Sequence, residues 1–288
     1  MITDRRSLLK GLAAAATMTV VSTPAEARER PQAPSDAVGL LYDTTKCIGC
    51  KACVVRCKEV GNLPADVDGY GDGLYDAPES LNEYTRNVIQ LYKDGGETSY
   101  VKKQCMHCID PACVNACMMG ALQKRAFGAV TWENNKCIGC RYCQVACPFG
   151  VPQFQWSKTS PRIVKCDLCA DRLAAGKKPG CVEACPRGAV ISGPRAALLA
   201  EAHQRIDANP DLYEPKVYGE TELGGTQVLY LSHVPFEKLG FRFSDPKSVP
   251  HLQQSVQHGI YKGFVAPLAL YGLLGAVMFR NRKKGGEE

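Results

Sequence analysis

The sequence predicts an α+β fold in which two small domains are interleaved along the chain and a hydrophobic helix follows near the C-terminus. Three observations support this: sixteen cysteines in four groups of four, two short segments that each occur twice, and an uncharged run of sixteen residues near the end of the chain. The length of 288 residues is sufficient for two small domains and additional segments.

Every cysteine of the chain belongs to one of the four groups. The groups are Cys47, Cys50, Cys53 and Cys57; Cys105, Cys108, Cys113 and Cys117; Cys137, Cys140, Cys143 and Cys147; and Cys166, Cys169, Cys181 and Cys185. The first and third groups have the spacing of bacterial ferredoxins, in which three close thiolates bind one [4Fe-4S] cluster and the fourth binds the other cluster of a pair. Because each cluster takes four thiolates, sixteen cysteines predict four [4Fe-4S] clusters.

Disulfides and zinc are alternative uses of these cysteines. An even number of cysteines would suit a disulfide-bonded exported protein, but thiols only three positions apart on one short loop bridge only with strain. Structural zinc favours two separated Cys-x2-Cys pairs, which only the fourth group resembles. A non-redox zinc protein therefore stays open as an alternative, and it would lack the brown absorption and paramagnetic signals of clusters.

Two segments of the sequence are duplicated. Residues 46–53 resemble residues 136–143, and residues 113–121 resemble residues 181–189. Between groups two and three, residues 121–123 and 129–132 with a turn at Gly128 predict a short β-hairpin. Groups two and three are therefore predicted to form one two-cluster domain, and groups one and four a second domain around it.

The exchange of the fourth cysteine within each pair predicts four ligand sets, called sites 1 to 4 below. They are Cys47, Cys50, Cys53 with Cys185 (site 1); Cys105, Cys108, Cys113 with Cys147 (site 2); Cys137, Cys140, Cys143 with Cys117 (site 3); and Cys166, Cys169, Cys181 with Cys57 (site 4). The alternative is tandem pairing of group one with two and three with four. It is less favoured because 47 residues, 58–104, separate the first two groups. Within this insertion Gly69, Gly71 and Gly73 predict a loop.

The N-terminus predicts export from the cytoplasm. Arg5 and Arg6 precede an apolar run over residues 11–21, and Ala25-Glu26-Ala27 is a suitable cleavage site. Residues 1–27 are therefore predicted to be a signal peptide for the twin-arginine export machinery, with an amphipathic or disordered N-terminus as the alternative. That route carries folded proteins, so clusters assembled in the reducing cytoplasm would arrive intact in the oxidising periplasm.

The C-terminus predicts a membrane anchor. Residues 264–279 are uncharged, and residues 260–280 are long enough for one transmembrane helix if Lys262 snorkels to the interface. The basic tail, residues 281–288, predicts a cytoplasmic C-terminus, which places the rest of the protein on the periplasmic side of the cytoplasmic membrane. A buried core helix is the alternative that the same length permits.

The remaining sequence divides into an iron–sulfur region over residues 38–200 and a partner-binding extension over residues 201–258. A helix is expected over 195–206, and one strand over 226–231 in an otherwise surface-lying segment. His107 and Arg141 lie beside ligands and are candidates for tuning a cluster potential, with ordinary packing as the alternative.

The composition argues against two other functions. The net charge of +6 does not indicate nucleic-acid binding, because basic side chains balance anionic clusters and no basic helix with interleaved aromatic residues occurs. The sequence has no grouping typical of an active site, so the chain is predicted to be a non-catalytic electron-transfer subunit of an oxidoreductase.

The cysteine groups, the signal and the anchor together resemble the exported four-cluster ferredoxin subunits of membrane oxidoreductases, the DmsB/NrfC-like iron–sulfur proteins. Further segments narrow the resemblance to HybA-type subunits of the periplasmic nickel–iron uptake hydrogenase (hydrogenase-2 type): residues 39–43, 101–108, 165–169, 179–183, 224–229 and 257–263. The chain departs from the ferredoxin pattern at Lys58 and Met118, where proline is common, without losing a ligand.

The resemblance implies two interleaved bacterial-ferredoxin-like domains with the nested ligand sets given above. It also implies partners: the hydrogenase small and large subunits, and a polytopic quinone-reactive subunit in the membrane. The chain would then relay electrons between hydrogen and the quinone pool. The alternative is the equivalent subunit of a molybdenum or tungsten enzyme, of the formate dehydrogenase or polysulfide reductase type.

Overall fold

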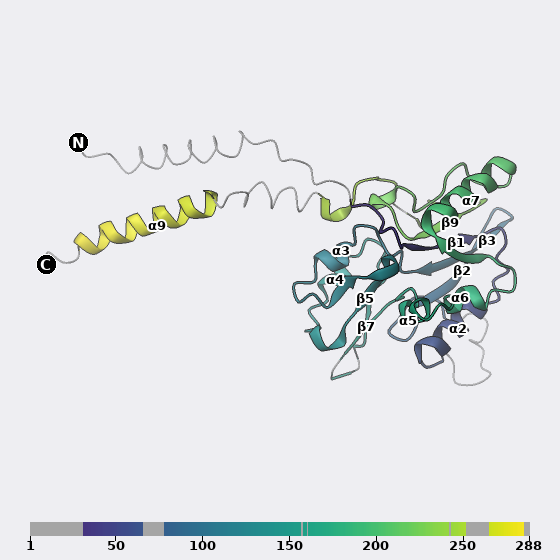
Figure 1. Cartoon of the computed structure of the whole chain (residues 1–288), viewed down its shortest axis with the longest axis horizontal. Coiled ribbons are helices and arrows are strands. Elements are labelled where there is room, and N and C mark those ends of the chain that lie inside the picture. Colours follow the sequence, from purple (N-terminus) through teal and green to yellow (C-terminus); the bar gives the residue numbers. More distant parts are fainter. Residues whose placement is uncertain are drawn as a thin grey trace. The chain divides into compact units, whose positions relative to one another are not determined.

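The computed structural model describes residues 31–65, 78–156, 158–159, 161–241, 243–251 and 265–284. The chain divides into a body within residues 30–249 and a second unit that contains the C-terminal helix α9 (Val265–Lys284) (Figure 1). The predicted signal peptide with Arg5 and Arg6, the Gly69–Gly73 loop and residues 260–264 lie outside the described residues. Among the helices that are described, none is long and apolar enough to cross a membrane.

The largest described sheet has three strands in the order β8–β1–β9. β1 (Val38–Asp43) precedes group one and pairs antiparallel with β8 (Val190–Pro194), which follows group four. On its other edge β1 pairs parallel with β9 (Val228–Leu231). β9 confirms the strand predicted over 226–231, but the segment around it was expected at the surface, and all four side chains of this strand are buried. Both faces of this strand are covered, which explains its uninterrupted apolar sequence.

Helix α7 (Arg195–Ala208) covers one face of this sheet and confirms the helix predicted over 195–206. Its apolar stripe, Leu198 and Ala202, packs against Leu41 of β1 and Leu229 of β9 in one core cluster. The alternate residues of the same strands belong to a second, larger core cluster that also contains several of the cysteines. The C-terminal part of the body therefore supports the sheet from which group one begins.

Three antiparallel strand pairs complete the described sheets. They are β2 (Asn87–Asp94) with β3 (Glu97–Gln104), β4 (Leu122–Lys124) with β5 (Val130–Trp132), and β6 (Gln153–Phe154) with β7 (Ile163–Val164). The β4–β5 hairpin was predicted. The β2–β3 hairpin was not, although Gly95 and Gly96, both at positive φ, form the two-residue turn that its sequence offers.

Short helices carry or adjoin the cysteines of each group. They are α2 (Ala52–Gly61), α3 (Ala112–Asn115), α4 (Tyr142–Ala146), α5 (Ala170–Ala174) and α6 (Gly180–Glu183). Single 3₁₀ turns lie at Ala126–Gly128, Asn134–Lys136 and Glu222–Gly224. Helix α3 packs against α4, and α2 packs against α6 (Figure 1). Groups two and three are thus neighbours, as are groups one and four.

The duplicated segments have the same strand pairing in both halves of the body. Leu122 of β4 lies opposite Trp132 of β5, and Val190 of β8 lies opposite Tyr42 of β1. In the repeat, Leu122 corresponds to Val190 and Trp132 to Tyr42, so the two registers are identical. The connection differs: β4 leads into β5 by a hairpin turn, whereas β1, the equivalent of β5, precedes β8, and all four cysteine groups lie between them.

Candidate functional site

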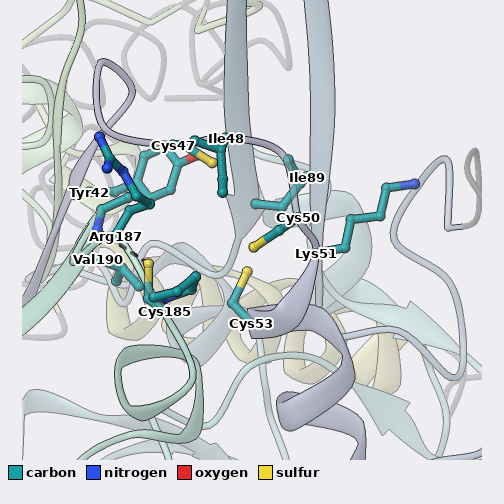
Figure 2. A pocket seen from close by; sticks show the side chains of 12 residues that line it. Tyr42, Cys47, Ile48, Cys50, Lys51, Cys53, Ile89, Cys185, Arg187 and Val190 are labelled. Atoms are coloured by element: carbon teal, nitrogen blue, oxygen red, sulfur yellow. Dashed lines mark hydrogen bonds between the residues drawn. The ribbon is translucent and has the colours of Figure 1, made fainter.

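All sixteen cysteines are free thiols, and they gather around separate centres in the body. Cys47, Cys50 and Cys53 line one cavity together with Cys185, and Figure 2 shows the four side chains around it. Cys47 and Cys50 come from the loop before α2, Cys53 lies in the first turn of α2, and Cys185 follows α6. Tyr42, Ile89 and Val190 form the apolar wall of this cavity. This is the set of cysteines predicted as site 1.

A second cavity has the equivalent composition in the other half of the body. It is lined by Cys117, Cys137, Cys140 and Cys143, the cysteines predicted as site 3. Trp132 and Leu122 occupy the places that Tyr42 and Val190 have in the first cavity. The match follows from the identical strand registers, which bring equivalent side chains to equivalent walls.

The cysteines predicted as site 2 also lie close to one another, and so do those predicted as site 4. Burial raises the pKa of the Cys108 thiol well above its usual range, and the charges of Cys105, Cys147 and Cys113 raise it further. Burial raises the pKa of Cys169 to about 11; the backbone N–H of Gly180 opposes this, and Asp167, Cys181 and Cys57 add to it. In each case the neighbouring thiols are members of one predicted ligand set.

Neighbouring cysteines of different sets give the order of the sites. Beyond the effect of burial, the charge of Cys181 raises the pKa of Cys53, that of Cys105 raises the pKa of Cys166, and that of Cys143 raises the pKa of Cys113. Cys53 of site 1 and Cys181 of site 4 share one core cluster. Cys105 of site 2 and Cys166 of site 4 share another. Cys113 of site 2 and Cys143 of site 3 share a third. The sites therefore follow one another as 1–4–2–3. The two exposed cysteines, Cys50 and Cys140, belong to the two ends of this row.

The donor sets fit [4Fe-4S] clusters in their chemistry. Each set offers four thiols, and backbone amides already point at the sulfurs: Gly49 N–H donates to Cys47 Sγ (3.4 Å), Leu168 N–H to Cys166 Sγ (3.4 Å) and Ala189 N–H to Cys185 Sγ (3.2 Å). Amide donors of this kind stabilise the negative charge that a reduced cluster carries. Among the described residues, no group of three His, Cys, Asp or Glu is arranged to hold a single metal ion.

Gly49 and Lys51, together with Gly139 and Arg141, turn the first and third cysteine loops through the left-handed region, with φ between 56° and 72°. Such turns let three sulfurs of one short segment face the same cavity. Glycine adopts this conformation readily, whereas Lys51 and Arg141 hold it against a steric cost. The same φ values at equivalent positions show that the duplicated sequence folds into the same loop twice.

The two candidate tuning residues differ in their surroundings. His107 is completely buried, and its Nδ1 accepts the N–H of Val130 (3.0 Å). Burial, and then the charges of Lys165 and Lys124, hold the pKa of His107 well below its usual value, so the ring is neutral at pH 7. Arg141 lies 4.2 Å from the ring centre of Trp156, in a cation–π contact at the rim of site 3.

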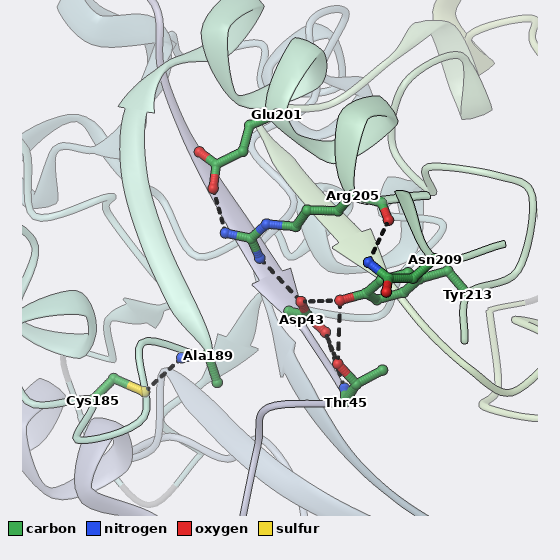
Figure 3. Close-up of polar contacts among 8 residues, drawn as sticks. All are labelled: Asp43, Thr45, Cys185, Ala189, Glu201, Arg205, Asn209 and Tyr213. Carbon is green, nitrogen blue, oxygen red and sulfur yellow. Dashed lines mark hydrogen bonds and ion pairs between the residues drawn. The ribbon is translucent and has the colours of Figure 1, made fainter. Parts of the chain in front are cut away.

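Sequence reasoning missed the charged groups that the fold buries near the sites. Asp43 is one of them (Figure 3): its carboxylate accepts Arg205 Nη1 (3.0 Å), Tyr213 Oη (2.9 Å) and both the N–H and hydroxyl of Thr45. Lys102 and Lys165 are two more. A charged residue in sequence is expected on the surface, so no local pattern distinguishes these three from their exposed neighbours.

Comparison with known proteins agrees with this geometry. A 4Fe-4S dicluster domain model matches residues 97–195, and with the cysteine centres it defines a ferredoxin-type iron–sulfur protein. The chain belongs to the HybA family. It is 37% identical to the "Hydrogenase-2 operon protein HybA" of Escherichia coli O157:H7 over 99% of both chains. It is 36% identical to the "Formate dehydrogenase, nitrate-inducible, iron-sulfur subunit" of Escherichia coli K12, over 82% of this chain and 81% of the relative.

The predicted resemblance is thereby confirmed. A third relative, the "Formate dehydrogenase iron-sulfur subunit" of Haemophilus influenzae, is 37% identical over 70% of this chain and 67% of its own length. The similarity to HybA extends over the termini, whereas the similarity to the formate dehydrogenase subunits covers a smaller share of the chain.

Proposed function

We propose that this chain is the electron-transfer subunit of a hydrogenase complex. It relays electrons between the catalytic small and large subunits of a periplasmic nickel–iron hydrogenase and a polytopic quinone-reactive subunit of the membrane. The observation that carries the proposal is the similarity to HybA over 99% of both chains, together with a row of four thiol centres. The chain itself contributes no catalytic site and acts only as the conductor.

The proposed electron-transfer path consists of four [4Fe-4S] clusters on the nested ligand sets. When bound, each cluster takes up and releases one electron, while the protein supplies thiolates, amide donors and apolar walls. The nested sets are supported by the cavity that Cys185 shares with Cys47, Cys50 and Cys53. Tandem pairing would instead require Cys117 there, and Cys117 lines the other cavity. The row 1–4–2–3 then has partner-facing ends at Cys50 and Cys140.

The iron content tests the cofactor assignment directly. Protein purified without oxygen is expected to contain about sixteen iron atoms and as many acid-labile sulfides, because each four-iron cluster uses four of sixteen thiolates. A redox titration is expected to resolve four one-electron steps. Stoichiometric zinc with little iron would contradict the assignment and favour the structural zinc protein.

A second candidate function is supported by the similarity to the formate dehydrogenase subunits. The two functions differ in the catalytic partner. An affinity-tagged chain is extracted from its own membranes in detergent and purified. Nickel and an activity that reduces a dye with hydrogen are expected to co-purify with it. Molybdenum or tungsten with formate-dependent dye reduction would instead establish the second candidate. The untagged strain is the control for non-specific capture.

We also propose that the protein is exported and anchored at the periplasmic side of the cytoplasmic membrane. Arg5 and Arg6 are the expected address for the twin-arginine machinery. Residues 264–279 are uncharged and precede a basic tail. Helix α9 by itself is not long and apolar enough to cross a membrane, so the proposed anchor also includes residues 260–264, which precede it.

Replacing Arg5 and Arg6 together by lysine tests the export step. The double variant is expected to remain in the cytoplasm with its clusters assembled, because the receptor reads the arginine pair and not the charge. Replacing Arg28 and Arg30 by lysine, in the same N-terminal region, is the matched control and is expected to leave export unchanged. Normal export of the Arg5→Lys/Arg6→Lys variant would contradict the assignment.

A further inference from the structure

Two lysine side chains deep in the body are not explained by packing alone. Lys102 is 1% exposed and Lys165 is 6% exposed. Burying an ammonium group is costly unless an opposite charge compensates it. Among the described ion pairs, neither lysine has a carboxylate partner. Lys58, a third buried lysine, donates its Nζ to the carbonyls of Pro64 and Tyr84.

Lys102 lies between sites 1 and 4. It projects from β3, and its ammonium donates to the side chain of Gln104. Burial acts to lower the pKa of Lys102, but neighbouring thiolates together raise it above its ordinary value. These thiolates are, in decreasing order of effect, Cys181, Cys53, Cys166 and Cys57. Three belong to site 4 and Cys53 belongs to site 1. Lys102 also lies opposite Ile89 in the β2–β3 hairpin, and Ile89 lines the site 1 cavity, so one ammonium adjoins two neighbouring sites.

Lys165 lies between sites 4 and 2. Its Nζ is 3.9 Å from the sulfur of Cys105, a site 2 ligand. The same Nζ donates to the carbonyl of Cys166 (2.8 Å), a site 4 ligand, and to the carbonyl of Val130. The two carbonyls hold the ammonium at the junction where Cys105 and Cys166 meet in one core cluster. Site 4 is therefore flanked by a buried cation on each side.

We propose that Lys102 and Lys165 are electrostatic positioning residues that raise the reduction potentials of the clusters on either side of them, with site 4 influenced by both. This inference rests on the four ligand sets of the proposed function. A [4Fe-4S] cluster on four thiolates is anionic, and reduction adds a further negative charge that a nearby fixed cation stabilises. In the low-dielectric interior this stabilisation is stronger than at the surface.

The position at a junction has a second consequence. An electron on one cluster repels an electron on the next, which makes the middle of a row of four clusters the hardest place to reduce. A cation shared by two neighbouring clusters offsets this repulsion. The two lysines thus keep the two inner sites, 4 and 2, accessible to electrons arriving from site 1 or site 3.

Lys103 provides a matched control in the same strand. Its Nζ donates to the carbonyl of Leu239 (2.7 Å) and lies 3.9 Å from the ring centre of Phe241. Burial alone lowers the pKa of Lys103 to about 8, with no thiolate acting on it. Replacing Lys103 by methionine therefore removes the same charge from the adjacent position without removing a cation from a junction.

The test is an anaerobic redox titration of the purified full-length protein at pH 7, followed by electron paramagnetic resonance. Lys102→Met and Lys165→Met are each expected to shift two of the four midpoint potentials downward. At a fixed ambient potential the ratio of reduced to oxidised cluster is expected to fall about tenfold at each shifted site, which is about 59 mV for one electron. Lys103→Met is expected to shift none.

With the double variant, the test does not require each electron paramagnetic resonance signal to be assigned to a particular cluster. Lys102→Met/Lys165→Met is expected to shift three of the four potentials, one of them, site 4, by about the sum of the two single shifts, and to leave one unchanged. Lys102→Arg and Lys165→Arg retain the charge and are expected to restore most of each shift. Charge, and not shape, would then be the cause.

The outcomes separate this inference from the proposed function. Fewer than four one-electron steps in the unaltered protein would contradict the four-cluster assignment itself. Four steps with unchanged potentials in Lys102→Met and Lys165→Met would overturn only the role of the lysines. If methionine and glutamine variants at both positions lose iron while Lys103→Met retains it, the lysines serve assembly and the tuning role is equally overturned.

Discussion

Individual residues decide how closely each cysteine loop can pack against the rest of the body. Gly49 and Gly139 hold the same place in the repeat and have nearly the same φ, 72° and 69°. Their surroundings differ. A Cβ on Gly49 would lie 2.3 Å from the ring of Tyr100, whereas a Cβ on Gly139 would lie 3.4 Å from the ring of Phe154. The two glycines are thus equal in backbone strain and unequal in available space.

Gly49→Ala is expected to be more damaging than Gly139→Ala. Both variants force an L-residue into the left-handed region, at a cost of about 1–2 kcal/mol. Gly49→Ala adds overpacking against Tyr100, at a further cost of about 1–3 kcal/mol. The rate of iron release on mild heating, followed by the loss of visible absorbance, compares the two variants. Equal rates would show that the contact with Tyr100 relaxes without cost.

At the scale of elements, the sheet β8–β1–β9 connects the outer helix α7 to site 1. Asp43 is the last residue of β1, and its carboxylate accepts a hydrogen bond from Arg205 of α7. The backbone N–H of Asp43 donates to the carbonyl of Ala189 (2.8 Å). The N–H of Ala189 in turn donates to the Cys185 sulfur (3.2 Å) (Figure 3). This series of contacts links helix α7 to Cys185, a proposed ligand of site 1, through the end of strand β1.

Asp43→Asn is expected to loosen this connection. The amide keeps the shape but removes the charge that balances Arg205 in a mostly buried pair, at a cost of about 3 kcal/mol. For a body of this size that corresponds to a fall of about 6–12 °C in the thermal midpoint. Glu201→Gln, which removes the other, more exposed partner of Arg205, is the control and is expected to cost less than about 1 kcal/mol. Similar midpoints for both variants would argue against a special role for Asp43.

At the scale of the whole molecule, the ligand sets join segments that are far apart in sequence. Site 1 combines Cys47 with Cys185, and in the row 1–4–2–3 each inner site shares a core cluster with the site before it and with the site after it. Groups two and three lie in the chain between groups one and four, and the fold places site 2 beside site 4 and site 3 beside site 2. The proposed path for electrons is therefore one continuous row of sites built from two copies of a small domain.

Double replacements of cysteine distinguish nested from tandem pairing. Two ligands of one cluster act as a unit, so removing both is no worse than removing one, whereas ligands of two clusters act additively. Cys47→Ser/Cys185→Ser is expected to lose about four iron atoms, the same number as either single variant, and Cys137→Ser/Cys185→Ser about eight. Iron analysis of the anaerobically purified variants measures this. Tandem pairing would give the reverse result.

Truncation after Gly259 tests the anchor at the same scale. The truncated chain retains all sixteen cysteines and is expected to keep about sixteen iron atoms. Hydrogen oxidation with a soluble dye is expected to continue, since that reaction needs only the catalytic subunits. Hydrogen-dependent quinone reduction is expected to fall at least tenfold, because docking then loses the high effective concentration of an anchored partner. A truncation after Lys284, which leaves the helix intact, is the control.

Much of the local structure could be predicted because its causes are local. Cysteine spacing, the Gly128 turn and the apolar face of the helix over residues 195–206 each depend on a few neighbouring residues. The β4–β5 hairpin and α7 were found where those signals lie. The β2–β3 hairpin was also within reach, since Gly95-Gly96 separates two strand-like runs. It was missed because the long interval between groups one and two was interpreted as a loop.

The sequence by itself determined the chemistry of this protein: the number of thiols, their grouping and the duplicated loops are statements about residue types and short spacings. Only the tertiary structure decided that β9 is the buried edge partner of β1, that the sites follow the order 1–4–2–3, and that Lys102 and Lys165 stand between them. These features depend on contacts between residues far apart in the chain. A strand end or a charged side chain has no local pattern that reveals its distant neighbour, because burial and charge pairing are properties of the folded whole.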